Sequence, residues 1–375
     1  MSRIRSALGA AMSHLEAADV TAATAAIQRA LGFGRRADHA EAAPERRVDV
    51  DAPPAGEARP RHSLADVVEA LRGLRARFAG PAEPATATGD AETDLDSRFT
   101  RHRFVCEAGA LSYKLYVPAV LPRRGASLVM MLHGCTQDPD DFARGTRMNA
   151  LADDHGLIVV YPQQSRGANA NGCWNWFDAR HQRRGAGEPA VLAGLARQIA
   201  ADHGIDRAHT FVAGLSAGGA MAEVLAATYP DVFAAAGIHS GLPYGAAADL
   251  ISAFGAMKGH GARAIPRTLE DGPEVRKIVF HGDADTTVHA SNGRTILDRA
   301  SAEIAGADQL IVDRTVNGRR VTQTTAGGAD GSAHTEHWLI HGGGHAWSGG
   351  ASVGSYTDPI GPDASREMVR FFLRG

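Results

Sequence analysis

The stretch TFVAGLSAGG spans residues 210–219 and places Ser216 at the centre of a G-x-S-x-G pattern. The β-branched and aromatic residues before the serine favour a strand, and the alanine-rich residues after it favour a helix. Such a sharp strand-to-helix turn holds its serine in a strained conformation and exposes the hydroxyl. The two glycines are expected because a Cβ on either side would clash in so tight a turn. An ordinary glycine-rich turn has the same composition, so the pattern needs support from the rest of the chain.

Strand-like and helix-like segments alternate on both sides of this turn. The alternation predicts an α/β fold, in which a mostly parallel sheet is covered by helices on both faces. We expect strands at 127–132, 157–161, 210–213, 233–239, 276–281 and 338–340, helices at 147–155, 189–203, 219–227, 291–304 and 364–373, and hairpins that join 100–107 to 111–117 and 312–316 to 321–325.

The N-terminal part of the chain has a different composition. It contains two short helical patterns, at 19–31 and 63–78, and the segments after them are rich in Pro, Ala and charged residues without periodicity. Such segments read as flexible linkers. We therefore expect a helical leader with linkers over residues 1–97 and an α/β domain over residues 98–375.

Composition narrows the function classes. The chain has 375 residues, of which 44% are hydrophobic, so it can bury a full core. The formal net charge of −3 at pH 7 argues against a dedicated nucleic-acid-binding protein. No apolar run approaches the ~20 residues that span a bilayer, and the first residues lack the apolar core of a signal peptide. The default expectation is a cytoplasmic protein without a membrane span.

A serine hydroxyl needs a base to activate it and an acid to orient that base. In an α/β-hydrolase the acid and then the histidine follow the serine along the chain. The acid candidates are Asp283 and Asp285, which follow the strand expected at 276–281. We favour Asp285 because H-G-x-x-D-x-x-V resembles the acid loop of many α/β-hydrolases. Asp283 has the simpler interpretation of a turn residue that binds its own backbone.

The base candidate is His345, which ends a glycine-rich segment. The glycines let this loop bend until one imidazole reaches the serine. The chain has 17 histidines, so a single one means little, and His334, His337 and His341 are nearby alternatives. His345 is favoured because it follows the serine and the acid in the expected order.

Backbone N–H groups are needed to stabilise the negative charge that forms on an attacked carbonyl oxygen. One is expected from Ala217, directly after the serine, and another from the loop that follows the strand at 127–132. That loop begins with His133 and Gly134. A plain strand exit is the alternative interpretation of these two residues.

Five motifs follow one another along the chain: LHGC at 132–135, GCWNWF at 172–177, GLSAGG at 214–219, HGDAD at 281–285 and GGHAW at 343–347. In this order they resemble the polyhydroxybutyrate depolymerase family of esterases, which also includes feruloyl and acetylxylan esterases. The resemblance covers roughly residues 100–375. It implies an α/β-hydrolase fold and the hydrolysis of carboxylic esters through an acyl-enzyme, without a metal or an organic cofactor.

The resemblance also implies a role for individual residues. Ser216 is the expected nucleophile, Asp285 the orienting acid and His345 the base. Cys135 and Ala217 are the expected donors of the two N–H groups to the oxyanion.

A disulfide between Cys135 and Cys173 is a further expectation from the resemblance. Its purpose would be to fix the loop that donates the Cys135 N–H before charge develops. Two unpaired thiols are the alternative, which a reducing cytoplasm favours. Many members of the family are secreted, so an extracellular location is the alternative to the cytoplasm.

The expected partner is an ester substrate, either small or polymeric. A polyhydroxyalkanoate such as poly(3-hydroxybutyrate), or a related short-acyl ester, is favoured over an ester of the feruloyl or acetylxylan type. Trp174, Asn175, Trp347 and Tyr244 are the candidates for substrate binding, and core packing is the alternative for the aromatic ones. A third interpretation is a catalytically silent hydrolase scaffold with an N-terminal interaction module.

Overall fold

The computed structural model describes residues 97–122, 125–260, 272–303, 308–327 and 333–374. The N-terminal helices and linkers expected from the sequence lie outside these residues. No helix in the described part of the chain is long and apolar enough to cross a membrane.

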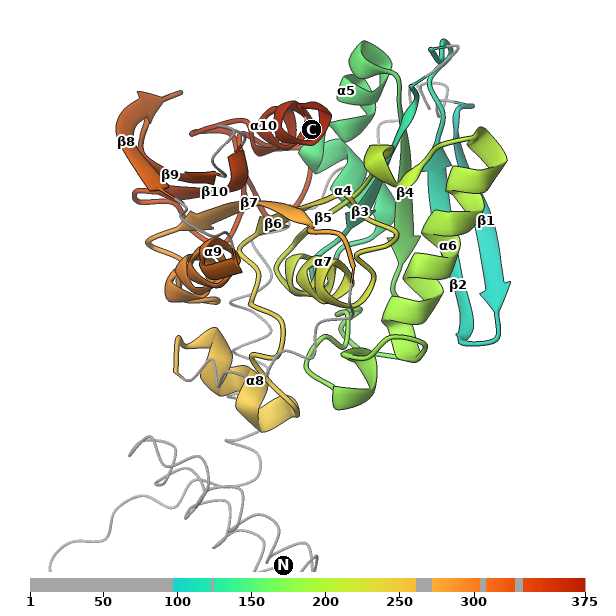
Figure 1. Ribbon diagram of the computed structural model, residues 1–375, viewed down its shortest axis with the longest axis horizontal. Coiled ribbons are helices and arrows are strands. Elements are labelled where there is room, and N and C mark those ends of the chain that lie inside the picture. Colours follow the sequence, from blue (N-terminus) through green and yellow to red (C-terminus); the bar gives the residue numbers. More distant parts are fainter. Residues whose placement is uncertain (1–96, 123–124, 261–271, 304–307, 328–332, 375) are drawn as a thin grey trace, which may run out of the picture. The chain divides into compact units, whose positions relative to one another are not determined.

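The described residues form one large sheet of ten strands and a small second sheet (Figure 1). The strands of the large sheet are β1 (Phe99–Cys106), β2 (Gly109–Tyr116), β3 (Ser127–Leu132), β4 (Leu157–Gln163), β5 (Thr210–Leu215), β6 (Ala235–His239), β7 (Arg276–Gly282), β8 (Asp308–Val316), β9 (Arg319–Gly327) and β10 (Ala333–Ile340), and the small sheet pairs β11 (Trp347–Ser348) with β12 (Thr357–Asp358). The order across the large sheet is β1-β2-β4-β3-β5-β6-β7-β10-β9-β8. The strands from β4 to β10 in this order run parallel to one another. An antiparallel hairpin lies at each edge of the sheet, β1 with β2 and β8 with β9. The mostly parallel sheet predicted from the sequence is therefore present.

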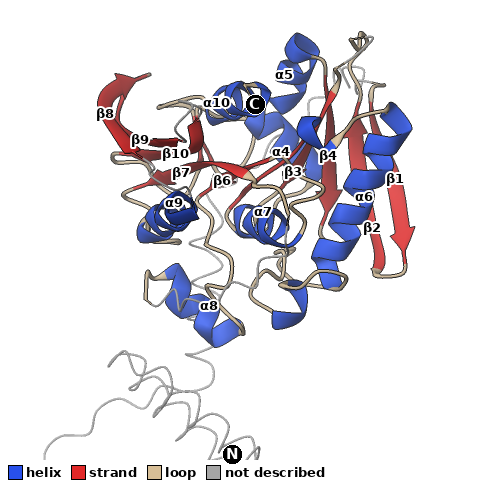
Figure 2. Cartoon of the chain, viewed as in Figure 1, coloured by secondary structure: helices blue, strands red, loops and turns tan. Residues whose placement is uncertain are grey.

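Helices cover both faces of the large sheet (Figure 2). They are α4 (Pro139–Thr146), α5 (Met148–His155), α6 (Gly187–His203), α7 (Ala217–Thr228), α8 (Leu250–Met257), α9 (Ser291–Glu303) and α10 (Ala364–Leu373), with the short 3₁₀ turns η1 (Ala179–His181) and η2 (Arg207–His209). Side chains of β3 alternate between the two faces, as the pleat of a strand requires. Leu128 and Met130 pack in the core beneath α6 and α7, and Val129 and Met131 pack in the core beneath α4, α5 and α10.

Two of these helices, α4 and α8, were not expected from the sequence. Each is short and begins at an aspartate whose carboxylate accepts a backbone hydrogen bond from the first turn. Asp138 accepts from the N–H of Asp141 at 2.8 Å, and Asp249 accepts from the N–H of Ser252 at 2.8 Å. Such caps satisfy donors that a short helix leaves unpaired. With only two turns each, these helices have too few apolar repeats to be recognised by periodicity.

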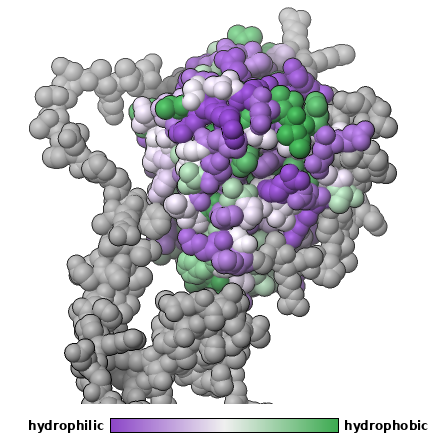
Figure 3. Space-filling view, turned by 90° about the vertical axis from the view of Figure 1, so that its left-hand side faces the viewer, coloured by the Kyte–Doolittle hydropathy of each residue, from purple (hydrophilic) through white to green (hydrophobic). Residues whose placement is uncertain are grey.

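The strand expected at 338–340 is longer in the structure, because β10 begins at Ala333 and pairs with β7 on one side and β9 on the other. The edge strand β8 is exposed along most of its length, and Leu310, Ile311 and Val312 are among its exposed residues. Figure 3 faces this side of the molecule and shows a mainly hydrophilic surface with small apolar patches. This edge extends the sheet without contributing much to the core.

Candidate active site

Ser216 lies in a tight turn between β5 and α7 and has the backbone angles φ 56° and ψ −118°. A positive φ is uncommon for a residue other than glycine, and it marks a strained backbone. The N–H of Ser216 donates to the carbonyl oxygen of His239 at the end of β6, at 2.9 Å. The turn is therefore tied to the neighbouring strand, and it holds the serine at the carboxyl edge of the sheet.

The glycines of the serine turn permit a very close approach of backbone segments. A Cβ on Gly218 would lie 2.0 Å from the carbonyl oxygen of Leu132 and 2.6 Å from that of His133. A Cβ on Gly214 would lie 2.4 Å from the carbonyl carbon of Gly218. Real side chains do not tolerate such distances. Glycine at both positions lets α7 begin directly against the end of β3.

Asp285 and His345 form a hydrogen-bonded pair between the loop after β7 and the loop after β10. The Nδ1 of His345 lies 2.6 Å from Oδ2 of Asp285, and Oδ1 accepts the backbone N–H groups of Thr287 and Val288, each at 2.8 Å. Burial raises the pKa of the Asp285 carboxyl, but the hydrogen bonds from His345 and Val288 outweigh it, so that the pKa is lowered. An ionised Asp285 keeps the proton of His345 on Nδ1 and leaves Nε2 as the proton acceptor.

Asp283, the other acid candidate, pairs with a different histidine. Its Oδ2 lies 2.8 Å from Nδ1 of His341, and its Oδ1 accepts the N–H of Gly342 at 2.7 Å. Burial raises the pKa of Asp283, but the hydrogen bonds from Gly342 and His341 outweigh it and the pKa is lowered. The structure thus gives each aspartate its own imidazole partner, and only Asp285 is paired with His345.

The loop of residues 133–138 lies beside the serine turn. A Cβ on Gly134 would be 3.7 Å from the Cβ of Ser216. Among the described residues, the N–H groups of Cys135 and Ala217 find no hydrogen-bond acceptor. Backbone donors in a protein interior are almost always paired, so an unpaired N–H beside a serine is available to a ligand. These are the two donors that the resemblance names.

A disulfide joins the 133–138 loop to the segment that follows β4. Cys135 and Cys173 are bonded, with their Cα atoms 4.3 Å apart. The N–H of Thr136 adds a hydrogen bond to the carbonyl oxygen of Asn171 at 2.7 Å. Cys106 is the remaining cysteine and is unpaired. The loop beside Ser216 is therefore tied covalently as well as by hydrogen bonds.

Gln137 also holds this loop, and the sequence analysis did not single it out. Its Oε1 accepts the N–H of Gly134 at 2.9 Å, and its Nε2 donates to the carboxylate of Asp141 and the carbonyl oxygen of Ser355, each at 3.0 Å. The amide thus links the loop to α4 and to the segment before β12. Its position four residues after His133 was the available sequence signal, but glutamine is too common on surfaces for that signal to stand out.

Trp174 and Trp347 lie in the core, which favours the alternative of core packing over substrate binding. Each is 1% exposed. The indole N–H of Trp174 donates to the carbonyl oxygen of His133 at 3.1 Å, and that of Trp347 donates to Oγ of Ser365 at 3.0 Å. A buried tryptophan whose N–H has a partner stabilises its surroundings by packing. Both rings support the loops of the site from beneath.

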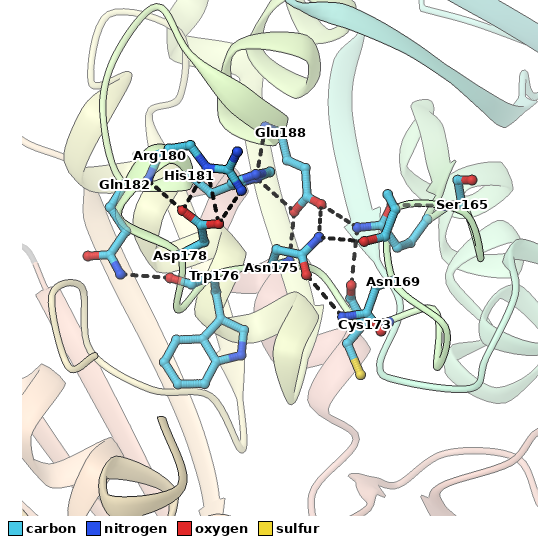
Figure 4. A network of polar contacts seen from close by, with 12 residues as sticks. Ser165, Asn169, Cys173, Asn175, Trp176, Asp178, Arg180, His181, Gln182 and Glu188 are labelled. Atoms are coloured by element: carbon cyan, nitrogen blue, oxygen red, sulfur yellow. Dashed lines mark hydrogen bonds and ion pairs between the residues drawn. The ribbon is translucent and has the colours of Figure 1, made fainter. Parts of the chain in front are cut away.

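Asn175 and Tyr244 are half-buried, and the structure uses their polar atoms internally. Asn175 donates to the carboxylate of Glu188 through its backbone N–H at 2.8 Å and through Nδ2 at 2.6 Å (Figure 4). The hydroxyl of Tyr244 donates to the carbonyl oxygen of Gln182 at 2.8 Å. A contact of either side chain with substrate stays a prediction.

Three histidines, His239, His281 and His337, are buried near the acid loop, and of these the sequence analysis named only His337, as an alternative base. His281 lies behind the acid, with Nε2 at 3.6 Å from Oδ2 of Asp285 and 2.8 Å from the carbonyl oxygen of Val288. Burial is the main cause that lowers the pKa of His239 to about 3, that of His281 to about 4 and that of His337 to about 3. All three are therefore neutral near pH 7.

The lowered pKa values of these three histidines predict that the folded protein loses stability in acid. Their pKa values are lower in the folded chain than the ~6.5 of an unfolded chain, so below that pH the unfolded state binds more protons. Stability is fully present above about pH 6.5 and is lost as the pH falls toward 4. The free energy of unfolding is expected to drop by up to ~1.4 kcal/mol per pH unit for each histidine.

Urea unfolding between pH 7.5 and 4.5 checks this prediction, in a range chosen to span the unfolded pKa of ~6.5. His337→Gln should make the slope of unfolding free energy against pH shallower by about one proton. His203→Gln, which alters an exposed histidine on α6, should leave the slope unchanged. Equal slopes for the wild type and His337→Gln would contradict the assignment.

Comparisons with known proteins show which proteins this chain is similar to. Residues 111–325 match the family model described as esterase PHB depolymerase. Poly(3-hydroxyalkanoate) depolymerase C of Paucimonas lemoignei is 36% identical over 255 residues, which cover 64% of this chain and 60% of that protein. Feruloyl esterase B of Neurospora crassa is 28% identical over 274 residues, which cover 68% of this chain and 86% of that protein.

A solved structure shows the same fold. Acetyl xylan esterase from Aspergillus awamori superposes with a TM-score of 0.58 at 21% sequence identity, and the match covers 74% of this chain and all of that chain. The α/β-hydrolase fold predicted from the sequence is thereby confirmed. This chain spans less than two thirds of the length of the Paucimonas depolymerase.

Proposed function

This chain belongs to the esterase PHB depolymerase family, and on that basis we propose that it is a serine hydrolase of carboxylic esters. Two observations carry the proposal: His345 is paired with a buried, ionised Asp285, and Ser216 lies in a strained strand-to-helix turn. The two unpaired N–H groups of Cys135 and Ala217 complete the set of parts that acyl transfer requires.

In the proposed reaction, Oγ of Ser216 attacks the ester carbonyl carbon while Nε2 of His345 takes the hydroxyl proton. Asp285 stabilises the imidazolium that forms. The carbonyl oxygen becomes an oxyanion and accepts hydrogen bonds from Cys135 and Ala217. The C–O bond to the alcohol then breaks, and His345 returns the proton to the leaving alkoxide. Water, activated by His345 in the same way, releases the acid from Ser216.

The favoured substrate class is a polyhydroxyalkanoate or a related short-acyl ester. This choice is supported by the Paucimonas relative, whose identity of 36% exceeds the 28% of the feruloyl esterase. A feruloyl or acetylxylan type of ester is the alternative. A panel of p-nitrophenyl acyl esters, amorphous poly(3-hydroxybutyrate) and methyl ferulate separates these classes by kcat/KM.

A fluorophosphonate probe tests the proposal against a silent scaffold. Such probes label only a serine that a neighbouring base activates. We expect labelling of the wild-type chain and its loss in Ser216→Ala. An unlabelled wild-type chain would contradict the proposed function.

The disulfide supports the extracellular alternative for the location. Disulfides persist in oxidising compartments and are rare where thiols are kept reduced. The Cys135–Cys173 bridge fixes the loop that carries a proposed oxyanion donor, so the protein is expected to work best where the bridge stays intact. Activity on a p-nitrophenyl ester before and after treatment with reductant measures this dependence.

Residues 1–97 are proposed to be dispensable for the hydrolysis of small esters. All residues assigned a role in ester hydrolysis lie beyond position 130, and the family match begins at residue 111. A chain that begins at Asp96 is expected to fold and to keep the kcat/KM of the full chain on a p-nitrophenyl ester. Loss of activity would show that the N-terminal residues complete the site.

A further inference from the structure

A cavity of about 560 Å³ opens beside the 133–138 loop. Its wall includes Thr136 but neither Ser216 nor His345. Thr136 lies two residues after Gly134, whose Cβ position is 3.7 Å from the Cβ of Ser216. Two residues of extended chain span only ~7 Å. Thr136, and with it the edge of this cavity, therefore lies within reach of an oligomeric substrate held at Ser216.

Two arginines give the cavity its charge. Arg103 is on β1, in register with Ser112 of β2, which is in register with Gln163 of β4, and all three line the wall. Arg166 lines it from the segment after β4. Both arginines are exposed, and neither guanidinium group has a hydrogen bond or an ion pair with any residue in the described part of the chain.

Few of the other described groups in the wall can pair with these two guanidinium groups in place of a ligand. Asp138 is the one carboxylate among the lining residues that the structure describes, and its Oδ1 already caps α4 through the N–H of Asp141. Among the described residues of the wall, the apolar ones are Ala110 and Leu111, apart from glycine. None of these described residues is aromatic, so they offer no stacking surface on which a sugar ring would pack.

The wall between β4 and Cys173 is held rigidly. Gln164 is 8% exposed, and its Nε2 donates to the carbonyl oxygen of Cys173 at 3.1 Å and to the carboxylate of Glu188 at 2.5 Å. Figure 4 shows how Glu188 gathers this segment by also accepting from Asn175. A wall that is ordered before binding loses little conformational freedom when a ligand arrives. Arg166 is thus carried on a segment with a fixed base.

We propose that this cavity binds a carboxylate, and that the carboxylate is the free end of the ester substrate. A guanidinium group binds a carboxylate through two parallel hydrogen bonds, and two such groups without partners fit one anionic end. The scissile ester would lie at Ser216 and the terminal carboxylate in the cavity. The chain would then release units from the carboxyl end of short hydroxyacyl oligomers. This inference rests on the proposed function and deepens it.

The test compares oligomers of 3-hydroxybutyrate that have a free carboxylate with the same oligomers ending in a primary amide. The amide keeps the size of the group and removes its charge. With dimers to tetramers, we expect kcat/KM for the internal ester to be about tenfold higher for the acid, the ratio that one charge-assisted hydrogen bond provides. High salt should reduce the preference, because it screens exposed charges.

The variants Arg103→Gln and Arg166→Gln should each reduce the acid-to-amide ratio, and the double variant should bring it near one. Arg144→Gln is the matched control, since Arg144 is an exposed arginine on α4 that does not line the cavity. It should keep the wild-type ratio. A wild-type ratio near one, or a ratio that the double variant leaves unchanged, would overturn the inference.

Two further measurements separate this inference from the proposed function. Hydrolysis of p-nitrophenyl acetate by the wild type tests the esterase alone. Binding of the acid and the amide to Ser216→Ala, measured by calorimetry, tests the cavity without turnover, and equal affinities would overturn the inference. A third outcome is that free 3-hydroxybutyrate binds the cavity while the acid and amide oligomers react equally. The cavity would then be a site for a separate carboxylate, and its assignment to the substrate would be overturned.

Discussion

Ser216→Ala is expected to lower kcat for a p-nitrophenyl ester by about a million-fold, as the loss of the nucleophile does in a comparable triad. The fold should survive, because alanine differs from serine only by the hydroxyl and the turn is held by backbone contacts. The N–H of residue 216 still donates to His239, and the glycines on either side are unchanged. Stopped-flow or endpoint assays of kcat, together with urea unfolding, measure both parts of this result.

Ser240→Ala provides a matched control. Ser240 is also a serine with a positive φ, 48°, and it follows β6 at the same edge of the sheet. It is buried, and its Oγ lies 3.2 Å from Nδ1 of His239. This variant should retain most of its activity. If Ser216→Ala kept more than a trace of the wild-type kcat, the assignment of the nucleophile would be wrong.

The second large effect is expected at Asp285. Asparagine in its place can donate a hydrogen bond to Nδ1 of His345. This bond favours the imidazole tautomer whose proton lies on Nε2. In that tautomer Nε2 cannot accept the proton of Ser216. A loss of roughly ten-thousand-fold in kcat is expected, as in a comparable triad. The kcat of the Asp285→Asn variant on a p-nitrophenyl ester measures this loss.

Asp283→Asn is the comparison that decides between the two carboxylates. Its partner is His341, so the change leaves the Asp285–His345 pair intact. Asparagine can still accept the N–H of Gly342 through its carbonyl oxygen. A much smaller loss is therefore expected. The opposite ranking of the two variants would show that Asp283 orients the base.

The sequence was most informative where function depends on local geometry. The strand 127–132 and the serine turn could be predicted because apolar runs, helix formers and glycines act within a few residues of one another. The glycine distances give this a physical basis: Gly218 is in contact range of β3. The family resemblance added the order of motifs, and it named Cys135 and Cys173 before any distance between them was known.

The sequence could not settle which residues far apart in the chain are in contact. Asp283 and Asp285 are two positions apart and follow the same strand, so no local pattern separates their partners. The separation comes from the loop after β10, which presents His341 to one and His345 to the other. Trp174 and Trp347 raise a similar difficulty, because a tryptophan close to a glycine or a histidine of a motif suits a cleft and a core equally. Only packing shows that both rings are buried.

The bridge between Cys135 and Cys173 also governs what a single cut in the backbone does. The bridged segment contains Arg166, a trypsin site in an exposed turn. A cut after Arg166 divides the polypeptide into two pieces that the bridge keeps joined. On a denaturing gel the nicked protein should migrate as one species without reductant and as two with it. The piece that carries the 133–138 loop then stays attached to the piece that carries Ser216 until the bridge is reduced.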